Sequence, residues 1–244
     1  MINKFFEKII DKKLNFGRDI IVKWCEEYIN NSNQNSFKII DIGCSRGEDL
    51  INIQTKIQKP LDMYGVEYYK PNAKIAEQHN IKVFNIDIEK EKIPIENNFF
   101  DIVIANQIIE HTKDIFWIFS EISRVIKKQG LIIIGVPNLA SLHNRILLLF
   151  GKQPTSIKVL GPHVRGFTAH SFKEFIECGG YFKVLKVKGS NFYPLPSSIA
   201  KILSNIFPTL SVGLFFKIIR LEKDGDFINI LDNMFFETSY FKRN

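Results

Sequence analysis

Acidic side chains stand at the ends of three successive apolar segments of the sequence: Asp41, Glu67 and Asp87. Each segment has the length and apolar character of a buried strand. Glu67 follows Asp41 at about the separation at which a second-strand carboxylate binds a ribose 2′-hydroxyl in nucleotide-binding folds. Acidic residues are common in loops after strands, but three in succession beside a glycine turn predict a ligand site.

The glycine turn follows the first of these carboxylates. Gly43 and Gly47 enclose Cys44 and Ser45, and the lack of Cβ atoms on the glycines lets backbone approach a ligand closely. The spacing is G-x-x-x-G, whereas the loop that holds a dinucleotide pyrophosphate has G-x-G-x-x-G. Asp41 would also repel a phosphate. The turn therefore favours a cationic or amino-bearing ligand.

Five motifs of the chain resemble, in order and spacing, those of the class I S-adenosylmethionine-dependent methyltransferases. They are D-I-G-C-S-R-G at 41–47, V-E-Y-Y at 66–69, N-I-D-I at 85–88, A-N-Q-I-I-E-H at 105–111 and G-L-I-I-I-G-V-P-N at 130–138. The resemblance covers about residues 37–187. It implies S-adenosyl-L-methionine as the cofactor and S-adenosyl-L-homocysteine as the product.

The same resemblance assigns the cofactor contacts. It implies that Glu67 binds the ribose hydroxyls, that Asp87 lies near the adenine amino group and that the fourth motif lines the wall beside the sulfonium. The residues expected to bind the cofactor are Asp41, Gly43, Cys44, Ser45, Gly47, Glu67, Tyr68, Asp87, Ile88, Asn106 and Gln107. The small size of Cys44 is a sufficient reason for its place in the turn. No metal-ligand set is predicted.

Alternating helix and strand patterns predict an α/β fold with a mainly parallel sheet covered on both faces. The resemblance makes it a Rossmann-like sheet of seven strands. We expect one methyltransferase domain over 1–244, because no repeat or linker divides the chain. Its expected parts are a helical cap at 1–36, a cofactor-binding core at 37–136, a substrate lid at 137–180 and C-terminal strands and a helix at 181–244.

Several elements are predicted individually. Apolar residues three and four apart predict a helix over Lys113–Lys128, with Gly130 placed to stop it. Pro71 is placed to begin a helix. Further expected elements are helices within 2–29, at 138–150 and at 197–207, and strands at 81–86, from 181 and at 212–221. The apolar stretch at 210–219 could meet a membrane or a second subunit, but core packing is favoured.

The long loop at 151–168 is the region expected to select the substrate, since loops of this length usually act as lids or binding surfaces. It carries His163 and Arg165, which can bind a phosphate or a hydroxyl. With Asn138 and Arg145 they form the predicted substrate-binding set. The alternatives are a helix-surface charge for Arg145 and a loop hydrogen bond for His163.

Motifs in this region resemble a branch of bacterial methyltransferases that modify cell-surface glycans and their precursors. They are N-x-x-S-L-x-N-R from Asn138, G-x-Q-P from Gly151 and H-x-R-x-F-T from His163. The resemblance implies an O-methyltransferase of a small hydroxyl or phosphoryl-type acceptor, such as a sugar, a nucleotide-linked sugar or a capsule or lipopolysaccharide precursor.

Methyl transfer to a neutral hydroxyl benefits from a general base, and a histidine of near-neutral pKa suits that task. His111, just after the fourth strand, is the first candidate, and His163 is the second. An anionic acceptor would need no base, and Arg165 would then matter more. The sequence does not separate these two mechanisms.

A formal net charge of +7 favours an anionic partner. Nucleic acid remains an alternative acceptor, but the lysines are spread along the chain, and Asn106 lacks the prolines that follow it in many base-methylating enzymes. The chain could also be an RNA or protein methyltransferase, or a catalytically silent cofactor-binding protein. We expect a small anionic or nucleotide-linked substrate and allow for a homodimer.

The sequence also favours a cytoplasmic location. The first residues carry scattered charges and no apolar stretch of signal-peptide type. No run approaches the roughly 18 apolar residues of a membrane span. The three cysteines lack metal-ligand spacing and are odd in number, as expected in a reducing compartment.

Overall fold

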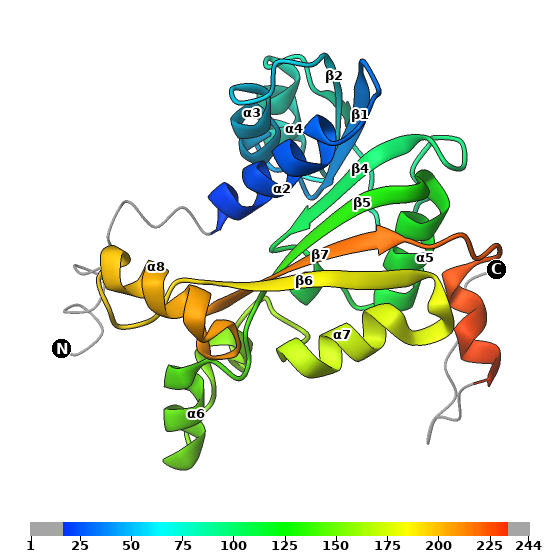
Figure 1. The fold of residues 1–244 in the computed structure, drawn as a ribbon. Coiled ribbons are helices and arrows are strands. Elements are labelled where there is room, and N and C mark those ends of the chain that lie inside the picture. The colour runs from blue at the N-terminus through cyan, green and yellow to red at the C-terminus, as the bar shows by residue number, and fades with distance from the viewer. Residues whose placement is uncertain (1–16, 234–244) are drawn as a thin grey trace.

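The computed structural model of the chain describes residues 17–233 and contains one seven-stranded sheet in the order β3-β2-β1-β4-β5-β7-β6 (Figure 1). The strands are β1 (Phe37–Ile42), β2 (Leu61–Val66), β3 (Lys82–Phe84), β4 (Phe100–Asn106), β5 (Ile126–Pro137), β6 (Phe182–Ser190) and β7 (Gly213–Arg220). Neighbouring strands are parallel except that β7 is antiparallel to both β5 and β6. The predicted Rossmann-like, mainly parallel sheet is confirmed.

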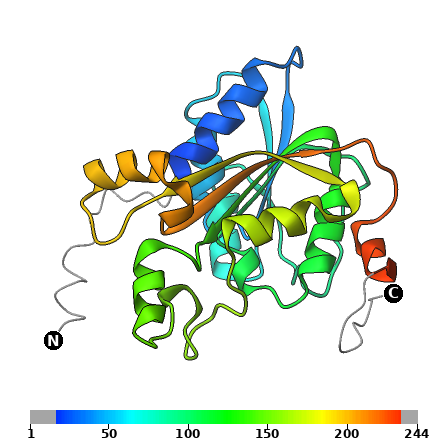
Figure 2. The same cartoon turned by 60° about the horizontal axis from the view of Figure 1, so that its bottom comes forward.

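Helices cover both faces of the sheet (Figures 1 and 2). One face carries α2 (Arg18–Asn30), α3 (Glu48–Gln54) and α4 (Lys70–Glu77), and the other carries α5 (Ile115–Val125) and α7 (Ala169–Glu177). Each face has its own apolar cluster: Trp24 of α2 lies in one and Phe119 of α5 in the other. Buried strands with apolar side chains on both faces require such a double cover.

The carboxyl ends of β1, β2, β4 and β5 meet at one edge of the sheet. At that edge Ile42 is in register with Val66, and Asn106 with Gly135. The chain order reverses between β1 and β4, which is the place where open α/β sheets bind ligands. The fold thus brings together the loops that carry the acidic motifs.

The helix predicted over 113–128 is shorter than expected. It begins after Asp114, whose carboxylate accepts a hydrogen bond from the Trp117 amide at 3.0 Å, and it ends at Val125. Lys127 is a strand residue of β5 and pairs with the carboxylate of Asp101 on β4 at 2.6 Å. The prediction of a last turn stopped by Gly130 was wrong, because pairing with β4 extends the chain from Ile126.

Two further boundaries differ from the sequence prediction. The helix expected from Asn138 is α6 (Leu142–Leu149), because Asn138 is held outside it by hydrogen bonds to another segment. The strand expected over 81–86 is only β3, and just after it the side-chain amide of Asn85 donates to the carbonyls of Glu67 and Tyr68.

Other elements agree with the prediction. Pro71 lies in the first turn of α4, α8 (Ser197–Ile206) ends before Pro208, and the strand expected at 212–221 is β7, which lies between β5 and β6. The apolar stretch near β7 packs in the core, where Phe215 and Phe216 are fully buried. The helices predicted within 2–29 lie partly outside the described residues, which contain α2. Among residues 17–233, no helix is long and apolar enough to cross a membrane.

Candidate active site

The glycine turn between β1 and α3 is closely packed. Gly43 and Gly47 have φ values of +75° and +82°, which favour glycine. A Cβ atom on Gly43 would lie 2.9 Å from the Ile108 side chain, and one on Gly47 would lie 2.3 Å from Ile81. The turn therefore needs both glycines for its conformation and for its approach to the residue before β3 and to the loop after β4.

Glu67 ties the turn to the start of α4. One carboxylate oxygen accepts a hydrogen bond from the Ser45 amide at 3.0 Å, and the other accepts one from the Tyr69 amide at 2.6 Å. Glu67 is partly exposed, so its oxygens have lone pairs left for a ligand. Tyr68 beside it is 72% exposed, which makes its ring available for stacking.

Asp41 lies beneath the turn and is buried. Burial raises the pKa of its carboxyl well above the usual value, and the neighbouring Asp49 carboxylate raises that pKa further. Arg18, at the start of α2, partly compensates the charge through a 3.0 Å ion pair with Asp49. This site is short of positive charge, as a site for a cationic ligand should be.

Asp49 and Arg18 were not predicted as site residues. Asp49 also accepts a hydrogen bond from the Asn106 amide at 2.8 Å, and it thereby joins α3 to the end of β4. The only sequence signal for Asp49 is an acidic residue in the first turn of a helix that follows the glycine turn. No local sequence pattern indicates that Arg18 belongs to the site, because it is the tertiary packing of α2 that brings Arg18 there.

The Cys44 thiol has no reactive surroundings. Burial raises its pKa, and the charges of Asp41 and Glu67 raise it further. A Cβ atom on Gly65 of β2 would lie 2.4 Å from the Cys44 sulfur. Cys44 therefore fills the space between β1 and β2, in agreement with the size argument from the sequence.

Asp87 lies in the loop after β3, where it pairs with Lys90 at 2.7 Å. The next residue, Ile88, is buried, and its carbonyl accepts a hydrogen bond from the Trp117 indole at 2.9 Å. Gln107 has a φ of +56°, and its amide donates to the Gly135 carbonyl at 2.8 Å. These contacts fix the backbone of both loops at the carboxyl edge.

Three ionisable side chains meet beyond the end of β4. One carboxylate oxygen of Glu110 and one ring nitrogen each of His111 and His163 all lie within 4.8 Å of one another. The two imidazole rings are in edge contact, with centroids 4.7 Å apart. The structure thus brings together the two histidines that the sequence proposed as alternative bases.

The loop that carries His163 is tied to the turn after β4. The amides of Val164 and Arg165 donate to the Glu110 carbonyl at 2.9 and 3.3 Å. The Nδ1 atom of His163 lies 2.8 Å from the Ser156 carbonyl, and that of His111 lies 3.4 Å from the Pro162 carbonyl. A carbonyl only accepts, so each Nδ1 carries a proton, and in a neutral ring the lone pair is then on Nε2.

Glu110 was quoted in the fourth motif but not predicted as a site residue. It is 1% exposed, and burial raises the pKa of its carboxyl to about 7. Burial also lowers the pKa of His111, as does the neighbouring His163. The cluster therefore holds a carboxyl that titrates near neutrality beside an imidazole that is neutral there.

Within residues 17–233, three buried side-chain polar atoms lack a hydrogen-bond partner: Asn106 Oδ1, Glu110 Oε2 and Arg165 Nε. An unpaired polar atom in the interior is costly, so such atoms require an explanation. Asn106 is the last residue of β4, Glu110 lies in the loop after it, and Arg165 lies in the segment docked on that loop. Two of them, Asn106 and Arg165, were predicted as binding residues.

The other two predicted substrate residues make structural contacts. Asn138 is buried, and its amide nitrogen donates to the carbonyls of Thr209 and Ser211 while its oxygen accepts from Ala140. Arg145 is exposed and donates to the Ala140 carbonyl at 2.8 Å. These contacts explain both side chains without a substrate, and their substrate role stays a prediction.

The Glu110, His111 and His163 cluster also has the donor types that bind divalent metal ions. Around a tetrahedral zinc ion, with bonds of about 2.0–2.1 Å, ligand atoms lie roughly 3.4 Å apart. The observed limit of 4.8 Å is wider. The side chains would therefore have to move closer together to bind such an ion.

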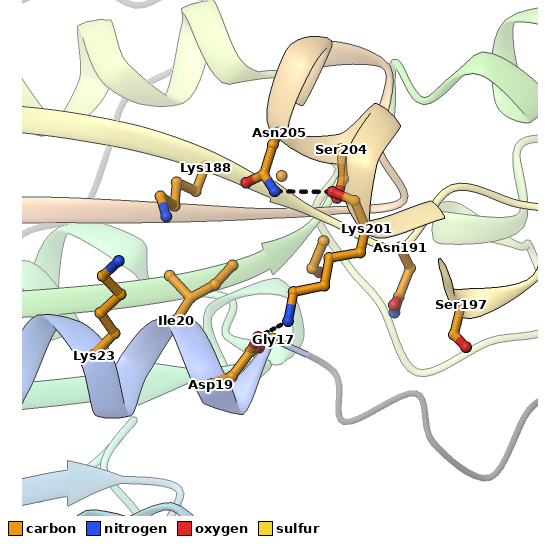
Figure 3. A pocket seen from close by; sticks show the side chains of 12 residues that line it. Gly17, Asp19, Ile20, Lys23, Lys188, Asn191, Ser197, Lys201, Ser204 and Asn205 are labelled. Carbon is orange, nitrogen blue, oxygen red and sulfur yellow. Dashed lines mark hydrogen bonds and ion pairs between the residues drawn. The ribbon is translucent and has the colours of Figure 1, made fainter. Parts of the chain in front are cut away.

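A separate cavity of about 340 Å³ lies between α2, β6 and α8 (Figure 3). Lys23, Lys188 and Lys201 line it, and Lys201 pairs with Asp19 at 3.5 Å. Burial lowers the pKa of Lys188, and the nearby lysines lower it further. None of the predicted site residues lines this cavity, so it is distinct from the candidate active site.

Comparison with known proteins agrees with this geometry. Residues 40–134 match the family model described as a methyltransferase domain. The ubiquinone biosynthesis O-methyltransferase of Pelagibacter ubique is 23% identical over 129 residues, which are 52% of this chain and 50% of that protein. The chain spans 39% to 50% of the length of the curated relatives it matches.

Solved structures share the fold. A methyltransferase of Thermotoga maritima, described as a possible histamine N-methyltransferase, has a TM-score of 0.57 at 18% identity and covers 90% of this chain and 95% of its own. The plantazolicin methyltransferase BpumL, solved in complex with a triazolic desmethylPZN analogue and SAH, has a TM-score of 0.59 at 15% identity and covers 90% of this chain and 91% of its own.

The domain match and the shared fold support a class I methyltransferase. They also support S-adenosylmethionine as its cofactor, in agreement with the prediction from the acidic motifs. The glycine turn, Glu67 and Asp87 stand at the carboxyl edge, where open α/β sheets bind ligands, and their cofactor contacts stay a prediction.

Proposed function

We propose that the chain is an O-methyltransferase whose acceptor binds between the turn after β4 and the loop at 151–168. The observation that carries the proposal is the set of unpaired buried polar atoms there. Glu110 Oε2 can accept a hydrogen bond from a hydroxyl of the acceptor other than the one that is methylated, and Arg165 Nε can donate one to an acceptor oxygen. Asn106 Oδ1 lies at the end of β4, where it can accept from the cofactor.

The proposed reaction is an in-line displacement at the sulfonium methyl group. The acceptor oxygen forms a bond to the methyl carbon as the carbon–sulfur bond breaks, and sulfur leaves as a neutral thioether. Positioning in a near-attack geometry supplies much of the rate. The hydroxyl proton passes to a neutral imidazole, and His111 is our first candidate because its pKa is lowered.

We propose a small acceptor of the surface-glycan type: a sugar, a nucleotide-linked sugar or a related capsule or lipopolysaccharide precursor. The motifs from Asn138, Gly151 and His163 support this class. With a phosphoryl-type acceptor, Arg165 would bind the anionic oxygen and no base would be needed. A cytoplasmic location fits such precursors and stays a prediction.

The test is methyl transfer from labelled cofactor to a panel of nucleotide-linked sugars, free sugars and phosphoryl compounds, with RNA and protein as further arms. Transfer to a hydroxyl of a sugar compound is expected. Transfer only to RNA or protein would overturn the acceptor class and keep the methyltransferase. Cofactor binding without transfer to any acceptor would favour a catalytically silent cofactor-binding protein.

A further inference from the structure

Exposed apolar side chains are concentrated on two segments, 138–168 and 191–212. Seventeen large apolar side chains of the described residues are exposed, and fourteen of them lie on these segments: Leu142, Ile146, Leu148, Leu149, Phe150, Val159, Leu160, Val164, Tyr193, Leu195, Ile199, Ile202, Ile206 and Phe207. Apolar side chains scattered singly over a surface need no explanation, whereas a contiguous set marks an interaction site.

The two segments lie side by side. Asn138 binds the carbonyls of Thr209 and Ser211, and the His143 and Tyr193 rings are in contact at 5.2 Å. Both views show α6 and α8 projecting from the same end of the sheet (Figures 1 and 2). We call this surface the α6–α8 face.

The helices of the α6–α8 face bury polar side chains and expose apolar ones. On α6, Asn144 is fully buried, while Leu149 is 81% exposed. On α8, Ser204 is buried, and Lys201 lines the cavity between α2 and β6, while Ile202 is 61% exposed. A surface helix of a soluble domain normally turns its apolar stripe to the core. These helices present theirs outward.

The charge on these segments has one sign. Segments 138–168 and 191–212 contain no aspartate or glutamate, although the chain has 26 acidic residues. They carry five cations: Arg145, Lys152, Lys158, Arg165 and Lys201. Exposed leucine and phenylalanine beside lysine and arginine are typical of helices that lie in the interface of an anionic membrane.

The charge argues against a second copy of the chain as the occupant. In a two-fold symmetric dimer the same patch meets itself, so cations would face cations with no acidic residue of either segment to pair them. Anionic lipid headgroups supply the missing negative charge, and acyl chains supply the apolar contact.

We propose that the α6–α8 face binds the surface of an anionic lipid bilayer without crossing it. Leu149 and Phe150, with Val159 and Leu160 of the following loop, insert below the headgroups. Lys152 and Lys158 remain at headgroup level, as long cationic side chains do. Segment 138–168 also carries His163, so the bilayer contact and the proposed acceptor site belong to one stretch of chain.

The test is co-sedimentation of the full chain with vesicles of phosphatidylcholine alone and of phosphatidylcholine with phosphatidylglycerol. Binding is expected to the anionic vesicles, weakening as salt is raised. The double variant Leu149→Ser/Phe150→Ser is expected to bind at least about tenfold more weakly. Leu185→Ser, which removes an exposed leucine of β6, is the control and is expected to bind as the parent does.

A second pair of variants separates charge from apolar contact. Lys152→Gln/Lys158→Gln is expected to weaken binding to anionic vesicles by about tenfold or more, because each cation near an anionic surface contributes. Lys56→Gln/Lys92→Gln, with the same loss of charge elsewhere, is the control. All four lysines are exposed, so the variants should melt at the temperature of the parent, which verifies that they are folded.

Three results would overturn the proposal. One is no sedimentation with either vesicle. Another is binding that the α6–α8 substitutions leave unchanged. The third is a concentration-dependent dimer that the same substitutions dissociate, which would make a second copy the occupant. Vesicle binding needs neither cofactor nor acceptor, so it stands or falls separately from the proposed O-methyl transfer.

Discussion

The two sides of the candidate active site are built in different ways. The proposed cofactor side comes from the ends of neighbouring strands, where Asp41, Glu67 and Asp87 each lie at or just after a strand end. The acceptor side forms when the loop at 151–168 docks on the turn after β4, which brings His111 against a carbonyl 51 residues later in the chain. Local sequence motifs thus form the cofactor side, whereas tertiary packing of distant segments forms the acceptor side.

The largest expected effect tests the acceptor side. His111→Ala should lower kcat by about 10²–10⁴ with a hydroxyl acceptor found in the panel, because proton transfer in the transition state is lost. Cofactor affinity should be unchanged in calorimetry. His170→Ala, on the exposed face of α7, is the matched control. A parent-like rate for His111→Ala would remove this residue as the base.

The next effect tests the cofactor side. Glu67→Ala should weaken S-adenosylmethionine binding by roughly 1.5–3 kcal/mol for each lost charge-assisted hydrogen bond. Calorimetry measures the change, and Glu77→Ala on α4 controls for the loss of a surface carboxylate. Unchanged affinity would contradict the ribose role of Glu67 and, with it, the division of the site into two halves.

Asp41→Asn should have opposite effects on stability and on cofactor binding: it should stabilise the fold and weaken binding. The folded-state pKa of Asp41 is raised, so the folded chain holds a proton that the unfolded chain has lost, and the free energy of unfolding falls as pH rises above the unfolded pKa. Without cofactor, the variant should melt at a higher temperature than the parent at about pH 8. The difference should vanish at about pH 3, where both states are protonated.

The same variant should bind the cationic cofactor more weakly, because a cation beside the turn favours the charged form of Asp41, which an asparagine cannot adopt. A lower melting temperature at about pH 8 would mean that the Asp41 charge stabilises the fold, which would contradict the assignment of burial as the cause of its raised pKa.

The smallest effect is expected at Arg145. Its guanidinium donates to the Ala140 carbonyl on the surface, so Arg145→Ala should change kcat/KM by less than about threefold and stability by about 0.5 kcal/mol or less. Steady-state kinetics and thermal melting measure both. A large loss of kcat/KM would restore the substrate role predicted from the sequence and enlarge the acceptor side.

The sequence predicted best the elements whose signals are local. The strands, the glycine turn and the Glu67 position follow from local patterns, since a short apolar run ending in a carboxylate is readable by itself. The end of α5 was misplaced because Ile126 fits both a helical face and a strand, and only pairing with β4 decides between them.

Other residues of the site lie beyond sequence prediction. Glu110 becomes informative only because the fold buries it beside His163, and Arg18 only because α2 crosses over α3. Asn138 is the opposite case. The sequence predicted it as a substrate-binding residue, but its side chain makes structural hydrogen bonds to the segment before β7.

The central claim is that the carboxyl edge at Asp41, Glu67 and Asp87 holds S-adenosylmethionine. Calorimetric titration of the full chain with S-adenosylmethionine, with NAD as the comparison ligand, tests it most directly. We predict saturable binding of S-adenosylmethionine that Glu67→Ala weakens and no binding of NAD. Absence of S-adenosylmethionine binding at millimolar concentration would contradict both the cofactor assignment and the interpretation of the acidic motifs.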